Sequence, residues 1–437
     1  MPESRQASFR RGIRRPRALR HITLVRRVWR RCHNAAGGTR DPEQDYPGEN
    51  EVLRFGRSRG TTVAVCAVLL MAAIGAEASR WRREPVPASP TPAAVRALGQ
   101  EQVVLTPRSA SRIQMPRGVP AAHASALAAL PGDDLLAFWW AGERESGADV
   151  KVYVARWDDG RWSAPRAVVD RDTLGDALGF AVRRIGNPSA WVAADGRVHL
   201  YVVATGLGGW AASRIVHLMS PDEGRSFEVQ RVLPMSPLFN TSALVRTSPV
   251  GAVDGGWLLP AYFELGNKYP MLVSFEEDGD PRWITRIGAL TTTLQPALVA
   301  VSGRELRALM RDHGDQRRLQ QAVSRDGGES WEDLPASELA NHDSSVAALR
   351  LRDGGFVMLH NEHVETAGSP RQWLRLSVSG DATTWTPGVD VLKGRPGDEF
   401  SYPSVQQIGR ELHVTYTSQR QAIAHHIYDI SYARTAR

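Results

Sequence analysis

The stretch that decides the fold is Ser324-Arg325-Asp326-Gly327-Gly328-Glu329-Ser330-Trp331. A second stretch, Ser220-Pro221-Asp222-Glu223-Gly224-Arg225-Ser226-Phe227, repeats its order of serine, aspartate, glycine and a final aromatic residue. Shorter turns with an aspartate and an aromatic residue occur at Asp158 to Trp162, Asp278 to Trp283 and Asp381 to Trp385. The five aromatic residues are spaced by 65, 56, 48 and 54 residues. The chain therefore contains a repeat with the length of a small β-sheet.

Short apolar runs follow the same period through residues 101–437. Six of them are DDLLAFWW, RVHLYVV, GWLLPAYF, ELRALM, GFVMLH and ELHVTYT, and each precedes a polar loop and a second strand. Helical periodicity is nearly absent. We predict an all-β fold, a six-bladed β-propeller of four-stranded sheets around a channel. Because the chain ends within the sixth repeat, we expect Gln102 to Leu105 to supply its outer strand and close the ring.

The two long turns match the Asp box S-x-D-x-G-x-x-W, with Phe227 in place of Trp in one of them. On these motifs the chain resembles the bacterial sialidase-like proteins with BNR repeats, over residues 101–437. The resemblance implies a propeller of the sialidase type and an enzyme that acts on a carboxylate-bearing sugar. The aspartates of the boxes, Asp222, Asp326 and Asp381, are expected to be structural, because a turn aspartate accepts backbone N–H bonds.

The positive charge of the chain lies in its N-terminal part. The net charge is +7, and residues 1–60 hold 15 arginines against 6 acidic residues, so the remainder is slightly acidic. A basic tail can bind nucleic acid or anionic lipid. Here it precedes an apolar run, and the simpler interpretation is that its positive charge keeps the N-terminal end in the cytoplasm. We therefore expect no nucleic-acid partner, a basic tail over 1–60, a hydrophobic segment over 61–78, a Pro-rich linker over 79–100 and the propeller over 101–437.

The hydrophobic segment TTVAVCAVLLMAAIGA, Thr61 to Ala76, is short for a transmembrane helix and long for the core of a signal peptide. Either a single-pass anchor holds the propeller outside the cytoplasm at the cell membrane, or cleavage near Ala78 releases it to the periplasm or medium. The only cysteines, Cys32 and Cys66, precede the propeller. Because no cysteine lies within the propeller, it can hold neither a disulfide nor a cysteine-based metal site.

The resemblance carries three candidate site residues over to this sequence. Sialidases hold the substrate carboxylate with three arginines and use a tyrosine nucleophile, an exception among glycosidases. Arg311, 15 residues before Asp326, resembles the second arginine, and Arg371 resembles the third, with Arg375 as its competitor. Tyr402, at the start of the sixth repeat, resembles the nucleophile. Arginine suits this clamp because its planar fork binds a carboxylate bidentately and keeps its charge.

Two positions depart from the family pattern. His123 stands where the first arginine is expected, and Gln295 stands where the glutamate partner of the tyrosine is expected. Without that glutamate a phenol of ordinary pKa has no evident base. His123 can bind a carboxylate as imidazolium or act as a base, and Glu264 can replace the missing glutamate. The expected acid/base is Asp149, with Glu143 and Glu145 as alternatives.

The remaining polar residues carry weaker expectations. Arg246 is a further candidate for binding the substrate carboxylate, or a structural partner of an acidic side chain. His360, Glu362 and His363 lack metal-ligand spacing, and His425 and His426 lie on opposite faces of one strand. We therefore expect no metal and no cofactor, and a monomer.

These observations support three functions. The first is an exo-sialidase-like glycoside hydrolase acting on a terminal acidic sugar. The second is a polysaccharide lyase on a uronate-containing glycan, which needs a neutralised carboxylate, an acid and a base but no activated tyrosine. The third is a non-catalytic glycan-binding propeller, in which the changes at His123 and Gln295 would be loss of catalytic residues.

Overall fold

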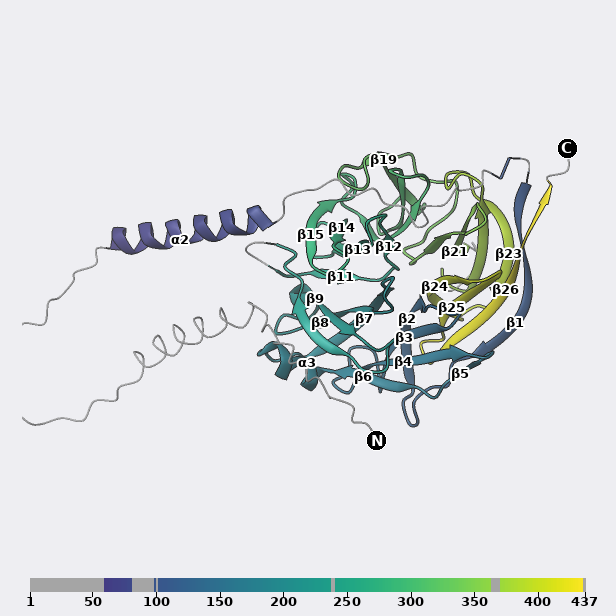
Figure 1. The fold of residues 1–437 in the computed structure, drawn as a ribbon, viewed down its shortest axis with the longest axis horizontal. Coiled ribbons are helices and arrows are strands. Elements are labelled where there is room, and N and C mark those ends of the chain that lie inside the picture. The colour runs from purple at the N-terminus through teal and green to yellow at the C-terminus, as the bar shows by residue number, and fades with distance from the viewer. Residues whose placement is uncertain (1–58, 81–97, 100, 237–239, 363–369, 435–437) are drawn as a thin grey trace, which may run out of the picture. The chain divides into compact units, whose positions relative to one another are not determined.

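The computed structural model of the chain describes residues 59–80, 98–99, 101–236, 240–362 and 370–434. Contacts divide the chain into two compact units, Met1–Ala64 and Val65–Arg437. Six antiparallel sheets are arranged around a common centre (Figure 1). The prediction of an all-β six-bladed propeller is confirmed. The expected basic tail and nearly all of the expected linker lie outside the described residues.

The first three sheets follow one another along the chain. The first contains β2 (Ala121–Ala129), β3 (Leu135–Gly142), β4 (Lys151–Asp158) and β5 (Arg161–Trp162), with β6 (Arg166–Asp170) paired to β4 and followed by α3 (Arg171–Leu178). The second contains β7 (Arg184–Val192), β8 (Val198–Thr205), β9 (Ser213–Ser220) and β10 (Glu228–Val232), with the short helix η1 (Gly209–Ala212) between β8 and β9. The third contains β11 (Ala243–Val245), β12 (Val250–Gly251), β13 (Trp257–Phe263), β14 (Tyr269–Phe275) and β15 (Pro281–Arg286).

The last three sheets complete the ring. The fourth contains β16 (Thr293–Ala300), β17 (Leu306–Asp312), β18 (Gln320–Ser324) and β19 (Glu332–Leu334). The fifth contains β20 (Ala347–Arg350), β21 (Phe356–Glu362), β22 (Trp373–Ser379) and β23 (Thr386–Lys393). The sixth contains β24 (Phe400–Ile408), β25 (Glu411–Ser418), β26 (Ala422–Arg434) and β1 (Glu101–Arg112).

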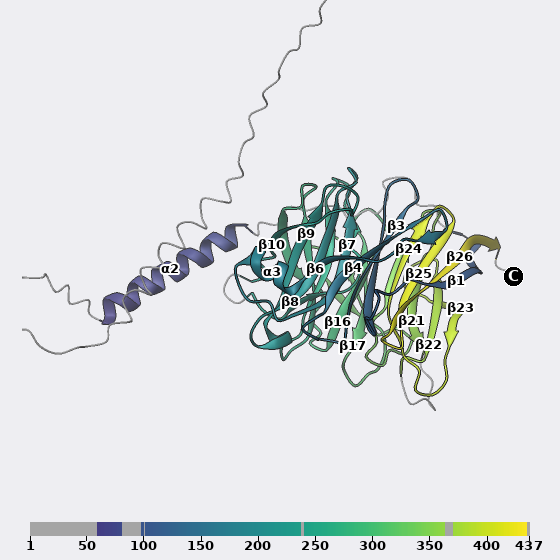
Figure 2. The same cartoon turned by 90° about the horizontal axis from the view of Figure 1, so that it is seen from below.

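The sixth sheet joins the two ends of the propeller. Strand β1 pairs antiparallel with β26, and the register places Leu105 opposite Ile430. The predicted closure by residues 102–105 is confirmed, and the paired segment is longer than expected. In the view turned by 90°, β1 and β26 lie side by side at one edge of the propeller (Figure 2). Pairing the last strand in this way covers a sheet edge that would otherwise be open to other chains.

The strand at the inner edge of each sheet lies at the central channel, and in the third sheet β11 and β12 together form this edge. Residues from β2, β7, β12, β16, β20 and β24 line one cavity near their carboxyl ends. Small side chains dominate β2, Ala121–Ala129, where it packs among the other inner strands. The neighbouring strands β3 and β8 are buried on both faces, which explains their continuous apolar runs.

The Asp boxes form tight turns between the third and fourth strands of their sheets. Asp326 accepts hydrogen bonds from the Ser324 hydroxyl (2.8 Å) and the Ser330 backbone N–H (3.0 Å). Asp222 accepts the equivalent bonds from Ser220 and Ser226, at 2.7 and 2.8 Å. These carboxylates are engaged within their own turns, as expected for structural residues.

Beta-bulges interrupt four of the channel strands near their beginnings. The register shifts after His123 in β2, after Ile185 in β7, after Leu294 in β16 and after Ser401 in β24. Within the bulges the backbone φ is positive at Ala124, Gln295 and Tyr402, at 59°, 50° and 53°. Such bulges re-aim side chains and are common beside functional sites. They place Gln295 and Tyr402 at one mouth of the channel.

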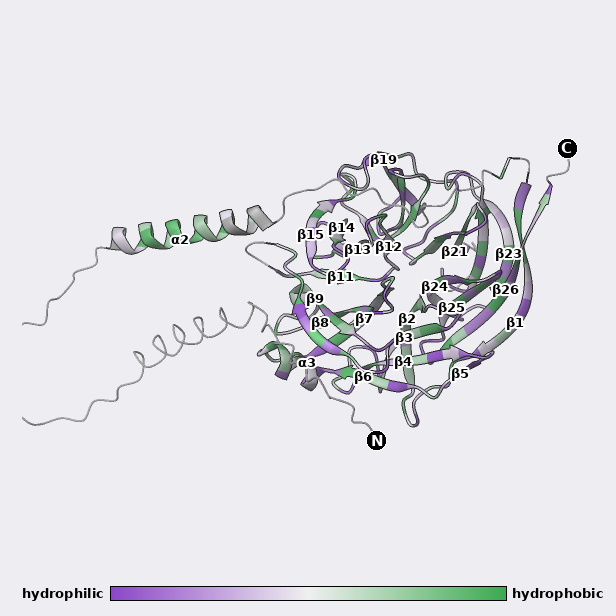
Figure 3. Ribbon diagram, viewed as in Figure 1, coloured by the Kyte–Doolittle hydropathy of each residue, from purple (hydrophilic) through white to green (hydrophobic). Residues whose placement is uncertain are grey.

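The predicted hydrophobic segment forms helix α2 (Arg59–Arg80), whose middle is coloured as hydrophobic in Figure 3. Nowhere in the described part of the chain is a helix both long and apolar enough to cross a membrane. The expectation of a transmembrane helix is therefore not supported, and export of the propeller stays a prediction.

Candidate active site

A pocket of about 200 Å³ opens at the mouth formed by the beginnings of the channel strands. Its volume lies just below the range of drug-sized ligand sites, about 300–1,000 Å³, and suits one small polar ligand. Polar and aromatic side chains from four sheets and from β24 line it: Trp140, Glu145, Asn187, Trp210, Tyr262, Glu264, Gln295, Arg311 and Tyr402. The expected site residues Tyr402, Arg311, Gln295 and Glu264 are therefore brought to one pocket.

Tyr402 lies among cationic and aromatic groups. Its ring centroid is 4.2 Å from that of His123. The guanidinium carbons of Arg246 and Arg371 lie 5.1 and 5.8 Å from the same centroid. Guanidinium groups at this distance from an aromatic ring interact favourably with it, and they would stabilise negative charge on the phenol oxygen as well.

Arg311 extends from β17 into the pocket wall. Its Nε donates to the Asp343 carboxylate (2.6 Å), and its Nη1 donates to the Gln295 amide oxygen (3.2 Å). Burial opposes the charge on Arg311, but the nearby Tyr402 phenol and the hydrogen-bonded Asp343 carboxylate outweigh it and raise the pKa of the guanidinium. Arg311 is thus a fixed positive charge in the pocket.

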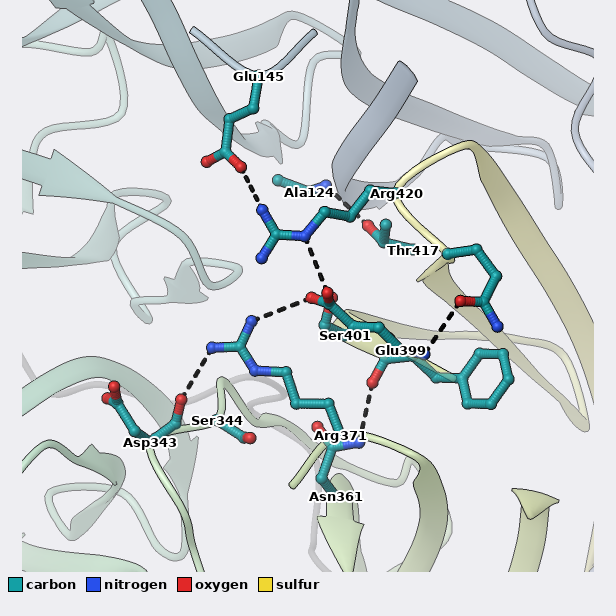
Figure 4. A network of polar contacts seen from close by, with 12 residues as sticks. Ala124, Glu145, Asp343, Ser344, Asn361, Arg371, Glu399, Ser401, Thr417 and Arg420 are labelled. Carbon is teal, nitrogen blue, oxygen red and sulfur yellow. Dashed lines mark hydrogen bonds and ion pairs between the residues drawn. The ribbon is translucent and has the colours of Figure 1, made fainter. Parts of the chain in front are cut away.

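Arg371 takes part in a chain of ion pairs that also includes Arg420 (Figure 4). Arg371 donates from Nη1 to Glu399 (3.2 Å) and from Nη2 to the Asp343 carbonyl (2.9 Å). Glu399 also accepts from Arg420 Nε (2.9 Å) and from the Ser401 hydroxyl (3.1 Å). Burial raises the pKa of Glu399, but Arg420, Arg371 and Ser401 lower it below its usual range. Glu399 therefore stays ionised and holds both arginines.

His123 is neutral in this environment. Its side chain is buried, and its ring also contacts Trp140 edge to face at 5.5 Å. Burial, followed by the positive charges of Arg420, Arg246 and Arg371, lowers the pKa of His123 well below its ordinary value. Burial and then the three neighbouring guanidiniums disfavour the imidazolium form that His123 would need to bind a carboxylate, so that role stays a prediction. The expectation that it serves as a neutral base is compatible with this position.

The guanidinium of Arg246 contacts the Tyr402 ring, and its side chain is fully buried. Its Nη1 and Nη2 donate to the carbonyl oxygens of Ser125 (3.0 Å) and Pro403 (2.6 Å), both within bulges of the channel strands. Burial lowers the pKa of Arg246 to about 10, so it stays charged at neutral pH. Both Nη groups bind backbone carbonyls, which supports a positioning role for Arg246, and binding of a ligand carboxylate stays a prediction.

The amide of Gln295 is also engaged. Its Nε2 donates to the Tyr262 hydroxyl (3.3 Å), while its oxygen accepts from Arg311. Burial, together with the nearby Glu264 carboxylate and Tyr402 phenol, raises the pKa of Tyr262. Glu264 lines the same pocket, but within the described residues no hydrogen bond joins its carboxylate to Tyr402. Gln295 therefore links Arg311 to Tyr262 at the place where a catalytic glutamate was expected.

The structure separates the three acidic candidates of the first sheet. The Asp149 carboxylate accepts the Glu143 backbone N–H (2.6 Å) and so closes its own loop, away from the pocket lining. Glu145 lines the pocket and forms an ion pair with Arg420. Glu143, the other alternative, is exposed and is not part of the pocket lining. Glu145 therefore occupies the position expected of Asp149, because the turn of the loop directs Asp149 back toward its own backbone.

Arg375, the competitor of Arg371, pairs with Glu362 (2.9 Å) and Asp390 (2.8 Å) within the fifth sheet. It is therefore engaged away from Tyr402. Among the described residues no cluster of three or more His, Cys, Asp or Glu side chains could hold a metal ion, and His363 lies outside them.

A larger cavity of about 300 Å³ lies at the opposite mouth of the channel. It is lined mainly by the carboxyl ends of the inner strands, with Ala128, Val192, Leu298 and Ala348 among its side chains. Few ionisable groups face it. We assign the candidate site to the smaller pocket because perturbed ionisable groups and a possible nucleophile converge there.

Two functional candidates were missed by sequence reasoning, Glu399 and Arg420. Glu399 directly precedes the expected nucleophile strand in GDEFSYPSV, and its nearness to Tyr402 was a usable signal. Arg420 lies in a hairpin far along the chain from β2, which it approaches through a hydrogen bond from the Ala122 N–H to its carbonyl (3.0 Å). No local pattern in the sequence indicates that approach.

Comparisons with known proteins agree with this architecture. A family model described as a BNR repeat-like domain matches residues 133–414. A search among curated protein sequences found no match. The fold is similar to a Hadza microbial sialidase, Hz136, with a TM-score of 0.59, 15% identity, and coverage of 71% of this chain and 66% of that one.

Two further solved structures have the same fold. A Dyadobacter fermentans protein of unknown function has a TM-score of 0.60 and 15% identity, covering 75% of this chain and 99% of that one. The Trypanosoma rangeli sialidase in complex with the inhibitor DANA has a TM-score of 0.57 and 14% identity, covering 74% of this chain and 60% of that one. The chain thus spans less than two thirds of these sialidases, and at such identity the likeness concerns the fold.

Proposed function

The chain belongs to the family of BNR repeat-like domains, and from that premise we propose that it is an exo-sialidase-like glycoside hydrolase acting on a terminal sugar that carries a carboxylate. The observation that carries the proposal is the gathering of Arg311, Arg371 and Arg420 around Tyr402 at one channel mouth. Guanidinium groups recognise carboxylates strongly. A pocket for one small ligand beside them fits a single acidic sugar unit.

The nucleophile of the proposed reaction is Tyr402. Its phenol oxygen attacks the anomeric carbon, the bond from that carbon to the glycosidic oxygen breaks, and a glycosyl-tyrosine forms. The proton of the phenol passes to neutral His123, whose ring contacts the Tyr402 ring. The neighbouring guanidiniums stabilise the negative charge that develops on the phenol oxygen. His123 and the guanidiniums would together activate Tyr402, which is the task of the glutamate that Gln295 replaces in this sequence.

Glu145 is the acid/base of the proposed reaction. In its protonated form it gives a proton to the departing glycosidic oxygen, and as a carboxylate it then takes a proton from the water that attacks the glycosyl-tyrosine. The water oxygen bonds to the anomeric carbon, and the phenol leaves with the proton held by His123. Glu145 is suited to this role because it lines the pocket from a half-exposed loop.

A second candidate, cleavage of a uronate-containing glycan by a lyase, is favoured by the state of His123. A neutral, buried histidine beside a tyrosine is an acid/base pair, and Gln295 in place of a glutamate does not impair such chemistry. In that reaction the arginines neutralise the uronate, His123 removes the proton next to the carboxylate, and Tyr402 protonates the departing oxygen. A double bond forms in the sugar and no water is consumed.

The test is product analysis in water enriched in oxygen-18. Incubation with a sialic-acid-terminated oligosaccharide should release an acidic sugar that contains one oxygen-18 atom, as hydrolysis requires. Incubation with a uronate polysaccharide should yield no product that absorbs in the ultraviolet. An unsaturated product without oxygen-18 would establish the lyase instead, and binding without any product would establish a glycan-binding propeller.

The nucleophile is tested with Tyr402→Phe. We expect turnover to fall by on the order of 100-fold or more, because the hydroxyl is the attacking group, while the affinity for an acidic sugar is nearly unchanged. Tyr269→Phe is the matched control, since that ring stacks on Phe263 outside the pocket lining. Near-full activity of Tyr402→Phe together with loss of activity in His123→Gln would contradict tyrosine nucleophilic catalysis.

A further inference from the structure

The ion pair between Arg420 and Glu145 joins the sixth sheet to the first across the candidate site (Figure 4). We propose that Glu145 occupies, in the ligand-free pocket, the position on Arg420 that the carboxylate of an acidic ligand takes when it binds. Binding is then an exchange of one carboxylate for another, and it frees Glu145. The identity of the ligand as an acidic sugar rests on the proposed function, whereas the exchange itself rests on the contacts that follow.

Arg420 is held at the site by a strained turn. It lies in the hairpin between β25 and β26, where both Gln419 and Arg420 have φ of 54°. Positive φ is costly for residues other than glycine and persists only where the surroundings enforce it. The Gln419 N–H donates to the Glu399 carbonyl (2.8 Å), and the Gln419 amide donates to Asp398 (2.7 Å). The turn is therefore fixed so that Arg420 extends toward β2 and the pocket.

The two carboxylates that Arg420 binds differ in how firmly they are held. Glu399 accepts from Arg371, Arg420 and Ser401, and its side chain is 23% exposed. Glu145 is 47% exposed, and its carboxylate contacts only Arg420 in the part of the chain that the structure describes. Exposed ion pairs of this kind contribute little stability. Glu145 is thus the carboxylate that a ligand can replace.

The loop of Glu145 can release the side chain without unfolding. Its shape is maintained by bonds within the loop, from the Gly147 N–H to the Arg144 carbonyl (3.0 Å) and from the Glu143 N–H to Asp149 (2.6 Å). None of these bonds uses the Glu145 carboxylate. Rotation of that side chain therefore breaks the contact with Arg420 and leaves the pocket wall in place.

Charge balance favours an exchange over simple addition. Without ligand, the positive charges of Arg371 and Arg420 are matched by Glu399 and Glu145. A third carboxylate would add like-charge repulsion at close range. Departure of Glu145 restores the balance, and it separates that carboxylate from Arg420. Arg420 thereby supplies the anion-binding group that the sequence lacks at His123.

The experiment measures binding of two probes, sialic acid and acetate, by isothermal titration calorimetry at pH 7. Glu145→Gln should tighten binding of both by roughly two- to five-fold, the range set by an exposed ion pair. Arg420→Ala should weaken binding by about tenfold or more, because it removes a charge-assisted partner. In the double variant, Glu145→Gln should have no further effect. Glu143→Gln, on the same loop, is the matched control and should change nothing.

Unchanged or weaker binding in Glu145→Gln would overturn the exchange, and so would an equal effect of Glu145→Gln with and without Arg420. Absence of binding in both the unmodified protein and Glu145→Gln would also overturn it. Turnover is not needed for any of these results. A protein that shows the exchange but releases no sugar refutes the proposed hydrolase and keeps the exchange, and a protein that hydrolyses its substrate without the Glu145 effect does the reverse.

Discussion

Lowering the pH from 7.5 to 4.5 should destabilise the propeller through a histidine pair buried between the first and sixth sheets. His425 accepts a hydrogen bond from the Trp162 indole N–H (3.0 Å) at Nδ1, and its Nε2 lies 3.1 Å from His413 Nδ1. Both rings are almost fully buried. Protonation at Nδ1 would break the bond from Trp162, because both atoms would then be donors.

The sign and magnitude follow from proton linkage. Burial, and then the charges of His413 and His426, lower the pKa of His425 to about 3, from an unfolded value of 6.5. Above pH 6.5 the folded and unfolded states are both neutral at this site, so stability is complete there. Between pH 6.5 and about 3 only the unfolded state binds the proton, and stability is lost as the pH falls. At pH 4.5 the loss from this one residue is about 3 kcal/mol.

The assay is guanidinium unfolding of the purified chain at a series of pH values. Over the lower half of this range, His425→Gln should reduce the slope of unfolding free energy against pH by about 1.4 kcal/mol per pH unit, the linkage of one proton. Ser111→Ala is the control, because it removes a hydroxyl 3.4 Å from His425 Nδ1 and leaves the histidine in place. It should lower stability at all pH values with little change of slope. An unchanged slope in His425→Gln would refute the reasoning.

Three further predictions concern positioning. Arg246→Met should lower the free energy of unfolding by about 2–5 kcal/mol in thermal unfolding, since the Ser125 and Pro403 carbonyls lose their donors. A loss of ligand affinity at unchanged stability would instead indicate that Arg246 binds the ligand carboxylate. Asp326→Ala should lower the free energy of unfolding by about 1–3 kcal/mol, because the turn loses the hydrogen bonds that Asp326 accepts. KM should not change, and a large change in KM would contradict a purely structural role for this aspartate. Gly186→Ala places a Cβ 2.8 Å from the Trp210 ring, so this part of the pocket wall must move. Calorimetry should therefore show weaker binding of a pocket ligand. Unchanged affinity would exclude Trp210 from the site.

The fold was predictable from the sequence because its signals are local. Each Asp box closes its own turn through bonds between residues two to four positions apart, as in Ser324 and Asp326. Apolar runs of strand length mark the sheets in the same local way. Even the closure by residues 102–105 followed from counting strands, since a sixth repeat without its last strand must borrow one.

The placement of Tyr402, Arg311 and Gln295 was also within reach of the sequence. Equivalent positions in successive repeats face the same mouth of the channel, so the repeat period carries them there. The role of each group depends on neighbours that no repeat encodes. The pKa of His123 is lowered first by burial and then by three guanidiniums from other sheets. Arg246 binds backbone carbonyls because two bulges direct them inward.

The ionic network was decided by tertiary structure alone. Arg420 and Glu145 are 275 positions apart, and their contact exists only because closure of the ring places the last hairpin against the first sheet. The sequence favoured Asp149 as the acid/base, but the turn directs its carboxylate to the Glu143 N–H of its own loop, whereas Glu145 faces the pocket. Strand patterns and turns are set by neighbours along the chain, whereas charge pairing and burial depend on distances across the ring, and those arise only when all six sheets have closed.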